Sequence, residues 1–238
     1  MPPARKPRPE SESSAESAGS GLSLPEEAYQ AIRANILDNQ WSPGFQATEM
    51  EVANRLNMSR TPVHEALMRL QQEGLVVVIP RHGMRVLPVA PSDMKEIYEV
   101  LRSLEATAAE LAAARKLSAA ELRPLEEASE AMDAALKADD LDAWAKADEA
   151  FHAHLLDLSG NRILKQMVLN TWDRAHRARM VTLRLRPKPM NSTREHRALV
   201  KAIKQGDAVA AGELQRAHRE RAGAELVQLL QRLGLNTL

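Results

Sequence analysis

The 238-residue sequence contains no cysteine, and aromatic residues make up only 3% of it. The absence of cysteine excludes disulfide bridges and thiolate metal sites. No stretch approaches the roughly 18 consecutive apolar residues that a membrane-spanning helix needs. The first residues also lack the apolar segment of a signal peptide. We therefore expect a cytoplasmic protein that has no contact with a membrane.

Neither sign of charge is in excess, because 32 Lys and Arg balance 32 Asp and Glu. This balance argues against a histone-like protein that coats DNA without regard to sequence. It does not exclude a sequence-specific protein whose basic groups lie on one small face. Apolar residues make up 44% of the chain, and alanine and leucine supply most of them, which favours helices over sheets.

The first 23 residues are rich in proline, serine, glutamate and glycine and show no apolar period. Such a segment buries too little surface to offset the entropy lost on ordering. We expect a disordered tail over residues 1–23, followed by domains at residues 24–88 and 89–238.

Residues 25–88 predict a winged helix-turn-helix. A helical pattern from Pro25 ends before the turn at 41–44. Thr48 and Glu51 form a capping box for a short second helix, and Ser59 is placed to cap a third. Two β-branched or apolar runs, 75–79 and 84–87, then predict a hairpin.

The third helix is the predicted DNA-reading element. Val63, Ala66, Leu67 and Leu70 have the spacing of a buried face, so the polar residues on the other face are free to contact bases and phosphates in the major groove. Ser59 and the free amides of the first turn favour a phosphate. The turn of the hairpin suits a wing in the minor groove. The candidate DNA-binding residues are Ser59, Arg60, Thr61, His64, Arg81, His82 and Gly83.

After the linker around Pro88 and Pro91 the pattern is helical throughout, and no strand pattern appears. The fold class that we predict is mainly α, with an N-terminal winged helix-turn-helix and a C-terminal, all-α, antiparallel bundle of six helices. The predicted helices are 92–115, 118–137, 140–158, 161–185, 191–205 and 207–233.

Four residues of the bundle form a candidate metal site. Asp148 and His152 are four residues apart, so they share one face of a helix. His196 and His218 flank the turn at 206–207 and come level if the last two helices pack antiparallel. Three imidazoles and a carboxylate suit Zn²⁺, Ni²⁺, Mn²⁺ or Fe²⁺. The alternative is a surface hydrogen bond between Asp148 and His152, with His196 and His218 unrelated to it.

The DNA-reading segment contains Thr48-Glu49, Val52-Ala53, Leu56 to Leu67, Leu70 and Glu73-Gly74-Leu75. In these residues it resembles the GntR family of bacterial repressors. This resemblance implies a homodimer in the bacterial cytoplasm, associated with the nucleoid, that binds a short palindromic operator in double-stranded DNA. It also implies DNA contacts by Arg60, Thr61 and the wing's His82 and Gly83. One departure is His64, where the family usually has arginine, so this contact is weakened.

The bundle resembles the FCD effector domain of FadR-type members, in its shorter, VanR-like branch. The order and spacing of Asp148, His152, His196 and His218 agree with the metal-binding members. The resemblance implies a divalent metal ion, zinc first, with nickel, manganese or iron as alternatives. The supporting motifs are Leu101 to Glu105, Asp148-x3-His152, His196 to Leu199, Gly206-Asp207 and Ala217-His218.

The expected function is a transcriptional regulator, in the repressing direction, that responds to a small organic acid. Arg102 is the expected carboxylate-binding residue, because a guanidinium holds a carboxylate through two hydrogen bonds. Asn170 and Arg174 are further candidates for the effector site. The alternative is a metal-dependent enzyme that carries a DNA-binding domain. No general base or catalytic loop stands out to favour it, and we expect no catalytic residues.

Overall fold

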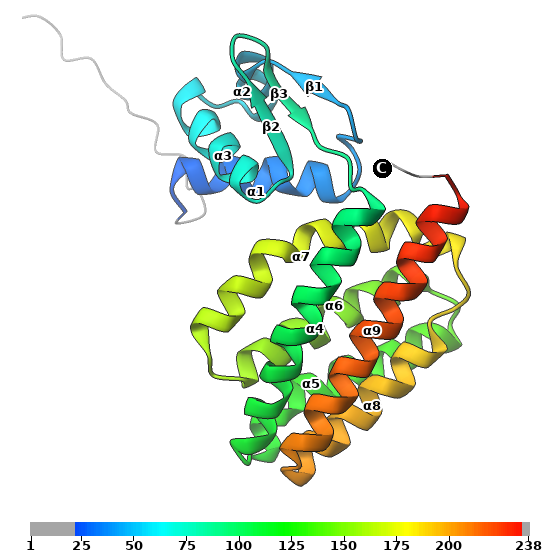
Figure 1. The fold of residues 1–238 in the computed structure, drawn as a ribbon. Helices are drawn as coiled ribbons and strands as arrows, with labels where there is room; N and C mark the ends of the chain where they lie inside the picture. Colours follow the sequence, from blue (N-terminus) through cyan, green and yellow to red (C-terminus); the bar gives the residue numbers. More distant parts are fainter. Residues whose placement is uncertain (1–21, 235–238) are drawn as a thin grey trace, which may run out of the picture.

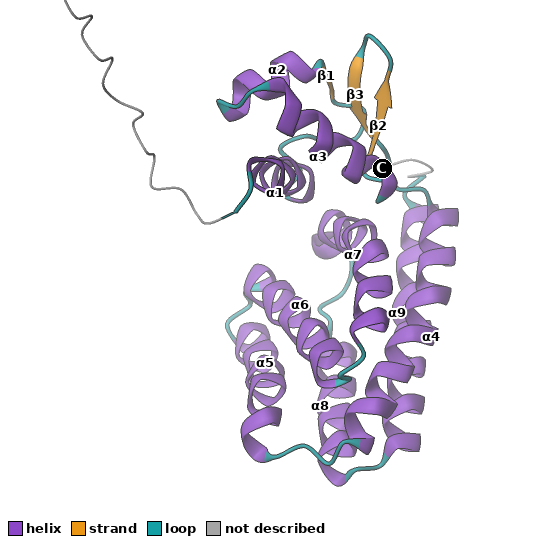
Figure 2. Cartoon of the chain, turned by 90° about the vertical axis from the view of Figure 1, so that its left-hand side faces the viewer, coloured by secondary structure: helices purple, strands orange, loops and turns teal. Residues whose placement is uncertain are grey.

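A computed structural model describes residues 22–234, so the expected tail 1–23 lies outside the described residues except for its last two positions. The described part contains nine α-helices and one small antiparallel sheet (Figure 1). The winged helix-turn-helix stands at one end of a helical bundle, and α1 lies beside α7 of the bundle (Figure 2). No described helix combines the length and apolar character needed to cross a membrane.

The winged domain has the predicted helices and hairpin, plus one strand that the sequence pattern did not predict. In sheet order β1-β3-β2, the short β1 pairs with β3 through Gln46–Arg85 and Ala47–Met84. Two residues are too few for a periodic pattern, so β1 depends on this tertiary pairing. The elements are α1 (Leu24–Leu37), β1 (Gln46–Ala47), α2 (Glu49–Leu56), α3 (Arg60–Gln72), β2 (Val76–Ile79) and β3 (Gly83–Val86).

Local signals set the helix-turn-helix geometry. The predicted capping box is present: Thr48 Oγ1 accepts a hydrogen bond from the Glu51 amide, and the Glu51 carboxylate accepts one from the Thr48 amide. Asn57 ends α2 in the left-handed region with φ 53°, which turns the chain into α3. Ser59 occupies the predicted N-cap position of α3, but its exposed side chain makes no cap hydrogen bond. The predicted buried face of α3, from Val63 to Leu70, is confirmed.

The bundle has the six predicted helices. Their boundaries lie within one residue of the predicted ones with one exception: the predicted helix 161–185 ends as an α-helix at Thr182 and continues as a short 3-10 turn, η1 (Leu183–Leu185). Helices α4 and α9 run side by side (Figure 1) and make the most extensive helix contact of the bundle. The six helices are α4 (Pro91–Ala114), α5 (Ala119–Lys137), α6 (Leu141–Leu158), α7 (Arg162–Thr182), α8 (Met190–Gln205) and α9 (Ala208–Arg232).

Helix α7 joins the two parts of the described chain. Its Asp173 pairs with Arg33 of α1 through both carboxylate oxygens. Its Arg177, almost fully buried, donates a hydrogen bond of 2.6 Å to the Leu87 carbonyl oxygen at the end of the wing. The Arg174 side chain lies 3.4 Å from the position that a Cβ at Gly74 would take, so it packs against the end of α3. The winged domain is therefore held to the bundle by charged side chains of one helix.

Candidate functional site

The DNA-reading side chains gather on one exposed surface. Ser59, Arg60, Thr61 and His64 are exposed on the outward face of α3, as predicted. A groove of about 510 Å³ separates this face from the wing, and its walls include Arg60, His64, Arg81 and Gly83. The structure thus brings most of the predicted DNA-binding residues around one groove, and the exposed His82 extends the tip of the wing.

Glu49 of α2 was missed by the sequence analysis and lies at the centre of this surface. Its carboxylate accepts a hydrogen bond of 2.8 Å from Arg60 Nε and lies 2.7 Å from His64 Nδ1. The hydrogen bond with His64 is the largest cause of a lowered pKa for Glu49; burial opposes it and Arg60 supports it. The carboxylate therefore fixes two DNA-reading side chains. No sequence period relates Glu49 to residues 11 and 15 positions away.

Gly83 has a structural role that differs from the one expected. Its φ is +85°, and a Cβ there would lie 2.2 Å from the Ala47 carbonyl oxygen. A side chain at this position would push β1 away from β3. Glycine is thus required for the three-stranded sheet itself, whatever the wing contacts.

Three of the four predicted metal ligands converge inside the bundle. His152 of α6, His196 of α8 and His218 of α9 place ligand atoms within 4.8 Å of one another, and all three are buried. The ring centroids of His196 and His218 are 4.5 Å apart, so the last two helices do pack level. Asp148 Oδ1 lies 3.8 Å from both His152 Nε2 and His196 Nδ1. The structure therefore brings the whole predicted set together.

Asp148 is oriented by an arginine of α7. Arg179 Nη1 donates a hydrogen bond of 2.7 Å to Asp148 Oδ2, which leaves Oδ1 facing the histidines. The Arg179 guanidinium also lies over the Trp172 ring, 5.3 Å from its centroid. Helix α7 thus contributes no ligand but contacts the cluster through Arg179 and Trp172.

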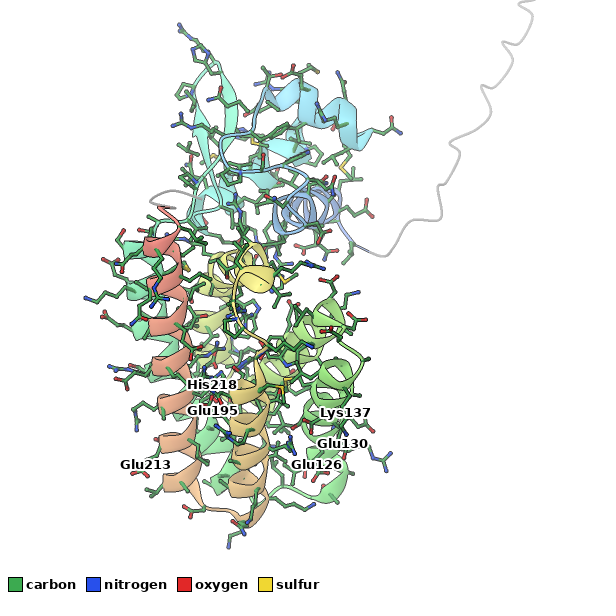
Figure 3. All side chains as sticks on the ribbon, turned by 90° about the vertical axis from the view of Figure 1, so that its right-hand side faces the viewer. Glu126, Glu130, Lys137, Glu195, Glu213 and His218 are labelled. Carbon is green, nitrogen blue, oxygen red and sulfur yellow. The ribbon has the colours of Figure 1, made fainter. Side chains whose placement is uncertain are left out.

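Carboxylates also stand behind two of the histidines. Glu195 of α8 lies beside His218 of α9 (Figure 3), with 2.8 Å between Glu195 Oε2 and His218 Nδ1. Glu105 Oε2 lies 3.1 Å from His152 Nδ1 and is itself held by Arg219, with both residues fully or nearly fully buried. Carboxylates in this position fix the orientation of a metal-binding imidazole. The sequence analysis missed both, because neither is at a helical spacing from its histidine.

The protonation states match those of a metal site. Burial lowers the pKa of His152 and His196 well below its usual value, and burial lowers that of His218 as well. Burial alone would raise the pKa of Asp148, but the nearby positive charges together, with Arg179 the largest of them, outweigh burial and the pKa is lowered. Neutral imidazoles and an ionised carboxylate are the forms that bind a metal ion.

The hydrogen bonding of the buried ring nitrogens tests whether these residues fit a metal ion. Nε2 of His152 and Nε2 of His196 make no hydrogen bond with a described residue, whereas Nδ1 of His152 lies beside the Glu105 carboxylate. Buried polar atoms are nearly always satisfied, and an unsatisfied one costs about 1–3 kcal/mol. A divalent cation would satisfy such nitrogens, so the residues present fit a metal.

Of the three residues expected to bind an effector, Arg102 lies apart from Asn170 and Arg174, which are one turn apart on α7. Arg102 is on the outer face of α4, 3.7 Å from Glu220, beside a cavity of about 330 Å³ between α4 and α9. Asn170 accepts a hydrogen bond from Gln166 and faces the junction with the winged domain. Arg174 pairs with Asp93 at 2.5 Å, near the same junction. None of them contacts the histidine cluster.

Comparisons with known proteins agree with this arrangement. The family described as "Bacterial regulatory proteins, gntR family" matches residues 24–86, and the FCD domain matches residues 96–221. An uncharacterized HTH-type transcriptional regulator in the TAR-I ttuE-ttuC' intergenic region of Agrobacterium vitis is 48% identical over 131 residues, which are 54% of this chain and 77% of that protein.

A second relative and a solved structure match over more of the chain. The HTH-type transcriptional repressor GlaR of Escherichia coli is 28% identical over 81% of this chain and 90% of its own length. The solved structure of E. coli McbR/YncC has a TM-score of 0.75 at 23% identity, and covers 87% of this chain and 98% of that one. The metalloenzyme alternative finds no support in these matches. The chain belongs to the gntR family of bacterial regulatory proteins, and it is a DNA-binding transcriptional regulator with an FCD domain, not an enzyme.

Proposed function

We propose that this regulator is a metal-containing repressor whose binding to its operator is modulated by a small organic acid. The observation that carries the proposal is the buried set of three histidines and one aspartate, in which Nε2 of His152 and Nε2 of His196 make no hydrogen bond with a described residue. The repressing direction is supported by GlaR, a relative named as a repressor. Binding of the acid releases the operator.

His152, His196, His218 and Asp148 would hold the metal, and zinc is our first assignment because the ligands are imidazoles and a carboxylate. The ion would supply positive charge, which favours the binding of an anionic effector nearby. Glu195 and Glu105 keep the imidazoles of His218 and His152 in place.

The DNA-bound form that we propose is a homodimer on a palindromic operator. Arg60 and Thr61 lie at the exposed N-terminus of α3, where side chains reach base edges in the major groove. Arg81 and His82 reach the neighbouring minor groove from the wing. One winged domain presents few basic groups, so a second copy is needed to supply enough phosphate contacts.

Helix α7 connects the two sites. Trp172 and Arg179 touch the cluster, whereas Asp173 and Arg177, on the same helix, hold α1 and the end of the wing. A shift of α7 therefore moves the winged domain. Because two half-sites lie at a fixed separation on the duplex, a small rotation of each winged domain lowers operator affinity.

Fluorescence anisotropy on a labelled operator tests this function, with metal-loaded and chelator-treated protein titrated against candidate organic acids. We expect an acid to release the loaded protein and to have little effect after the metal is removed. Arg102→Ala is measured in parallel, because Arg102 was the carboxylate-binding residue expected from the sequence.

An acid response of equal size with and without metal would contradict the proposal. Retention of helicity by circular dichroism is the control that chelation has not simply unfolded the bundle. An operator affinity that rises with acid would keep the sensor function and contradict the repressing direction.

A further inference from the structure

A second cavity of the bundle lies between α9 and the segment that leads from η1 to α8. Its volume is about 390 Å³, the size of a site for a small metabolite. The segment over it, residues 185–189, follows directly from the helix that touches both the histidine cluster and the winged domain (Figure 1). Its lining has four basic side chains and one acidic side chain: Arg186, Lys188, Arg221, Arg232 and Glu225.

Arg186 differs from Lys188 and Arg221, two other cations that line the cavity. Its Nε is buried, and no hydrogen bond or ion pair with a described residue engages it. By contrast, Lys188 pairs with Asp139 at 2.6 Å, and Arg221 binds both Glu195 and Glu225. A guanidinium that is partly removed from water without a partner costs stability, so it indicates a missing anion.

The environment of Arg186 connects the cavity to the histidine cluster. Burial lowers the pKa of Arg186; the nearby Arg179 adds to this effect, whereas Asp148 opposes it. On the other wall, Arg221 holds Glu195, which in turn contacts His218. A ligand in the cavity is thus linked to His218 through Arg221 and Glu195, and its other contact, Arg186, interacts electrostatically with Asp148.

We propose that Arg186 binds the carboxylate of the effector in this cavity, in place of the role that the sequence suggested for Arg102. The guanidinium donates to both carboxylate oxygens, which satisfies the buried Nε. Because Arg186 follows α7 by four residues, ligand binding here pulls on the end of that helix. That the bound anion is the effector rests on the proposed function. Anion binding at Arg186 itself does not depend on the metal.

The test compares Arg186→Met with Arg184→Met, a matched control on the same segment. Arg184 is 64% exposed at its side chain and pairs with Asp142 at 2.6 Å. The metal content of each full-length protein is measured first. Its thermal unfolding is then followed without additive and with succinate, inorganic phosphate or succinamide. Succinamide is the uncharged analogue of succinate. Arg102→Met is included as the competing assignment.

We expect Arg186→Met to raise the unfolding midpoint without additive by about 2 °C, because it removes an unpaired charge. Succinate should stabilise the wild type, Arg184→Met and Arg102→Met, with at least about a tenfold loss of apparent affinity in Arg186→Met. Succinamide should do nothing. Metal content should be the same in all four proteins.

Several results would overturn the inference. A lower midpoint of Arg186→Met without additive would show a structural role. An unchanged succinate response in Arg186→Met, no wild-type response to succinate, or a response to phosphate alone would each contradict carboxylate binding. A succinate response that persists after metal removal but requires Arg186 supports the inference while contradicting a metal-dependent effector site.

Discussion

Histidine serves different purposes in this chain because its surroundings differ. His64 is exposed on α3, where Glu49 holds it within the DNA-reading surface. His152 and His196 are fully buried and have ring nitrogens without partners. His176 of α7 is 14% exposed at its side chain and lies 3.8 Å from Glu149, apart from the cluster. Only burial together with convergence distinguishes the metal-type histidines.

The environment of His176 predicts that the folded protein loses stability in mild acid. Burial, with the nearby Arg179 and Arg33, lowers its pKa from 6.5 to about 4. Between pH 6.5 and about 4, the unfolded chain therefore binds a proton at His176 and the folded chain does not. As the pH is lowered through that window, the free energy of unfolding decreases by up to about 3 kcal/mol.

Urea unfolding at several pH values checks this. His176→Gln should lose less stability than the wild type between pH 6.5 and 4, with parallel curves above pH 7. Identical slopes in the two proteins would show that His176 is protonated in the folded state.

Arg60 predicts a base-specific loss of operator affinity. Arg60→Ala should weaken binding by about 1–3 kcal/mol and relax the preference at one base pair of each half-site, since arginine at a recognition helix reads guanine. Binding to operator variants by anisotropy measures both effects. A uniform loss across all variants would instead assign Arg60 to a phosphate.

At the scale of elements, the two capping boxes provide a matched pair. Thr48 caps α2 beside the wing, and Ser118 caps α5 of the bundle, each with a glutamate three residues on. Thr48→Ala and Ser118→Ala should each cost about 1 kcal/mol of unfolding free energy. Only Thr48→Ala should also weaken operator binding, because α2 carries Glu49. Equal effects on DNA binding would contradict this local role.

A substitution in α7 should uncouple metal binding from the acid-induced release of the operator. Asp173→Asn removes the ion pair with Arg33 of α1, so the acid-induced release of the operator should shrink severalfold. Metal content should stay at the wild-type level, since Asp173 does not contact the histidines. Metal analysis and operator anisotropy on the same sample separate these results. A full acid response in Asp173→Asn would show that the signal takes another path.

The sequence predicts those parts that depend on local spacing. Asp148 and His152 are one helical turn apart, and the hairpin around Gly206 brings His196 and His218 level. The sequence does not predict contacts between distant segments. Arg179 reaches Asp148 across 31 residues, and a two-residue strand such as β1 has no period of its own.

Contacts between distant segments also explain why the structure points to a different effector-binding arginine from the one expected from the sequence. Arg102 lies in a motif that resembles effector domains, but its guanidinium faces Glu220 on the outside of the bundle. Arg186 directly precedes Pro187 in a segment without a motif, and only the folded structure shows its buried, unpartnered Nε.

For the whole molecule, the cluster stands where the two cores of the bundle meet. Phe151, from the core shared by α5, α6 and α8, stacks on His196 with centroids 4.2 Å apart. Trp172, from the core around α4, α7 and α9, contacts the edge of His152.

A metal that binds only the folded bundle adds to its stability. Chelation should therefore lower the midpoint of bundle unfolding by several degrees, and restored metal should raise it again.

The most direct test of the central claim is the metal content of the purified protein. The wild type is compared with His196→Ala/His218→Ala and with His154→Ala/His176→Ala, which removes two histidines outside the cluster. We predict about one divalent ion per chain in the wild type and the control, and almost none in the cluster variant. No metal in the wild type after loading, or equal metal in all three proteins, would contradict the metal site.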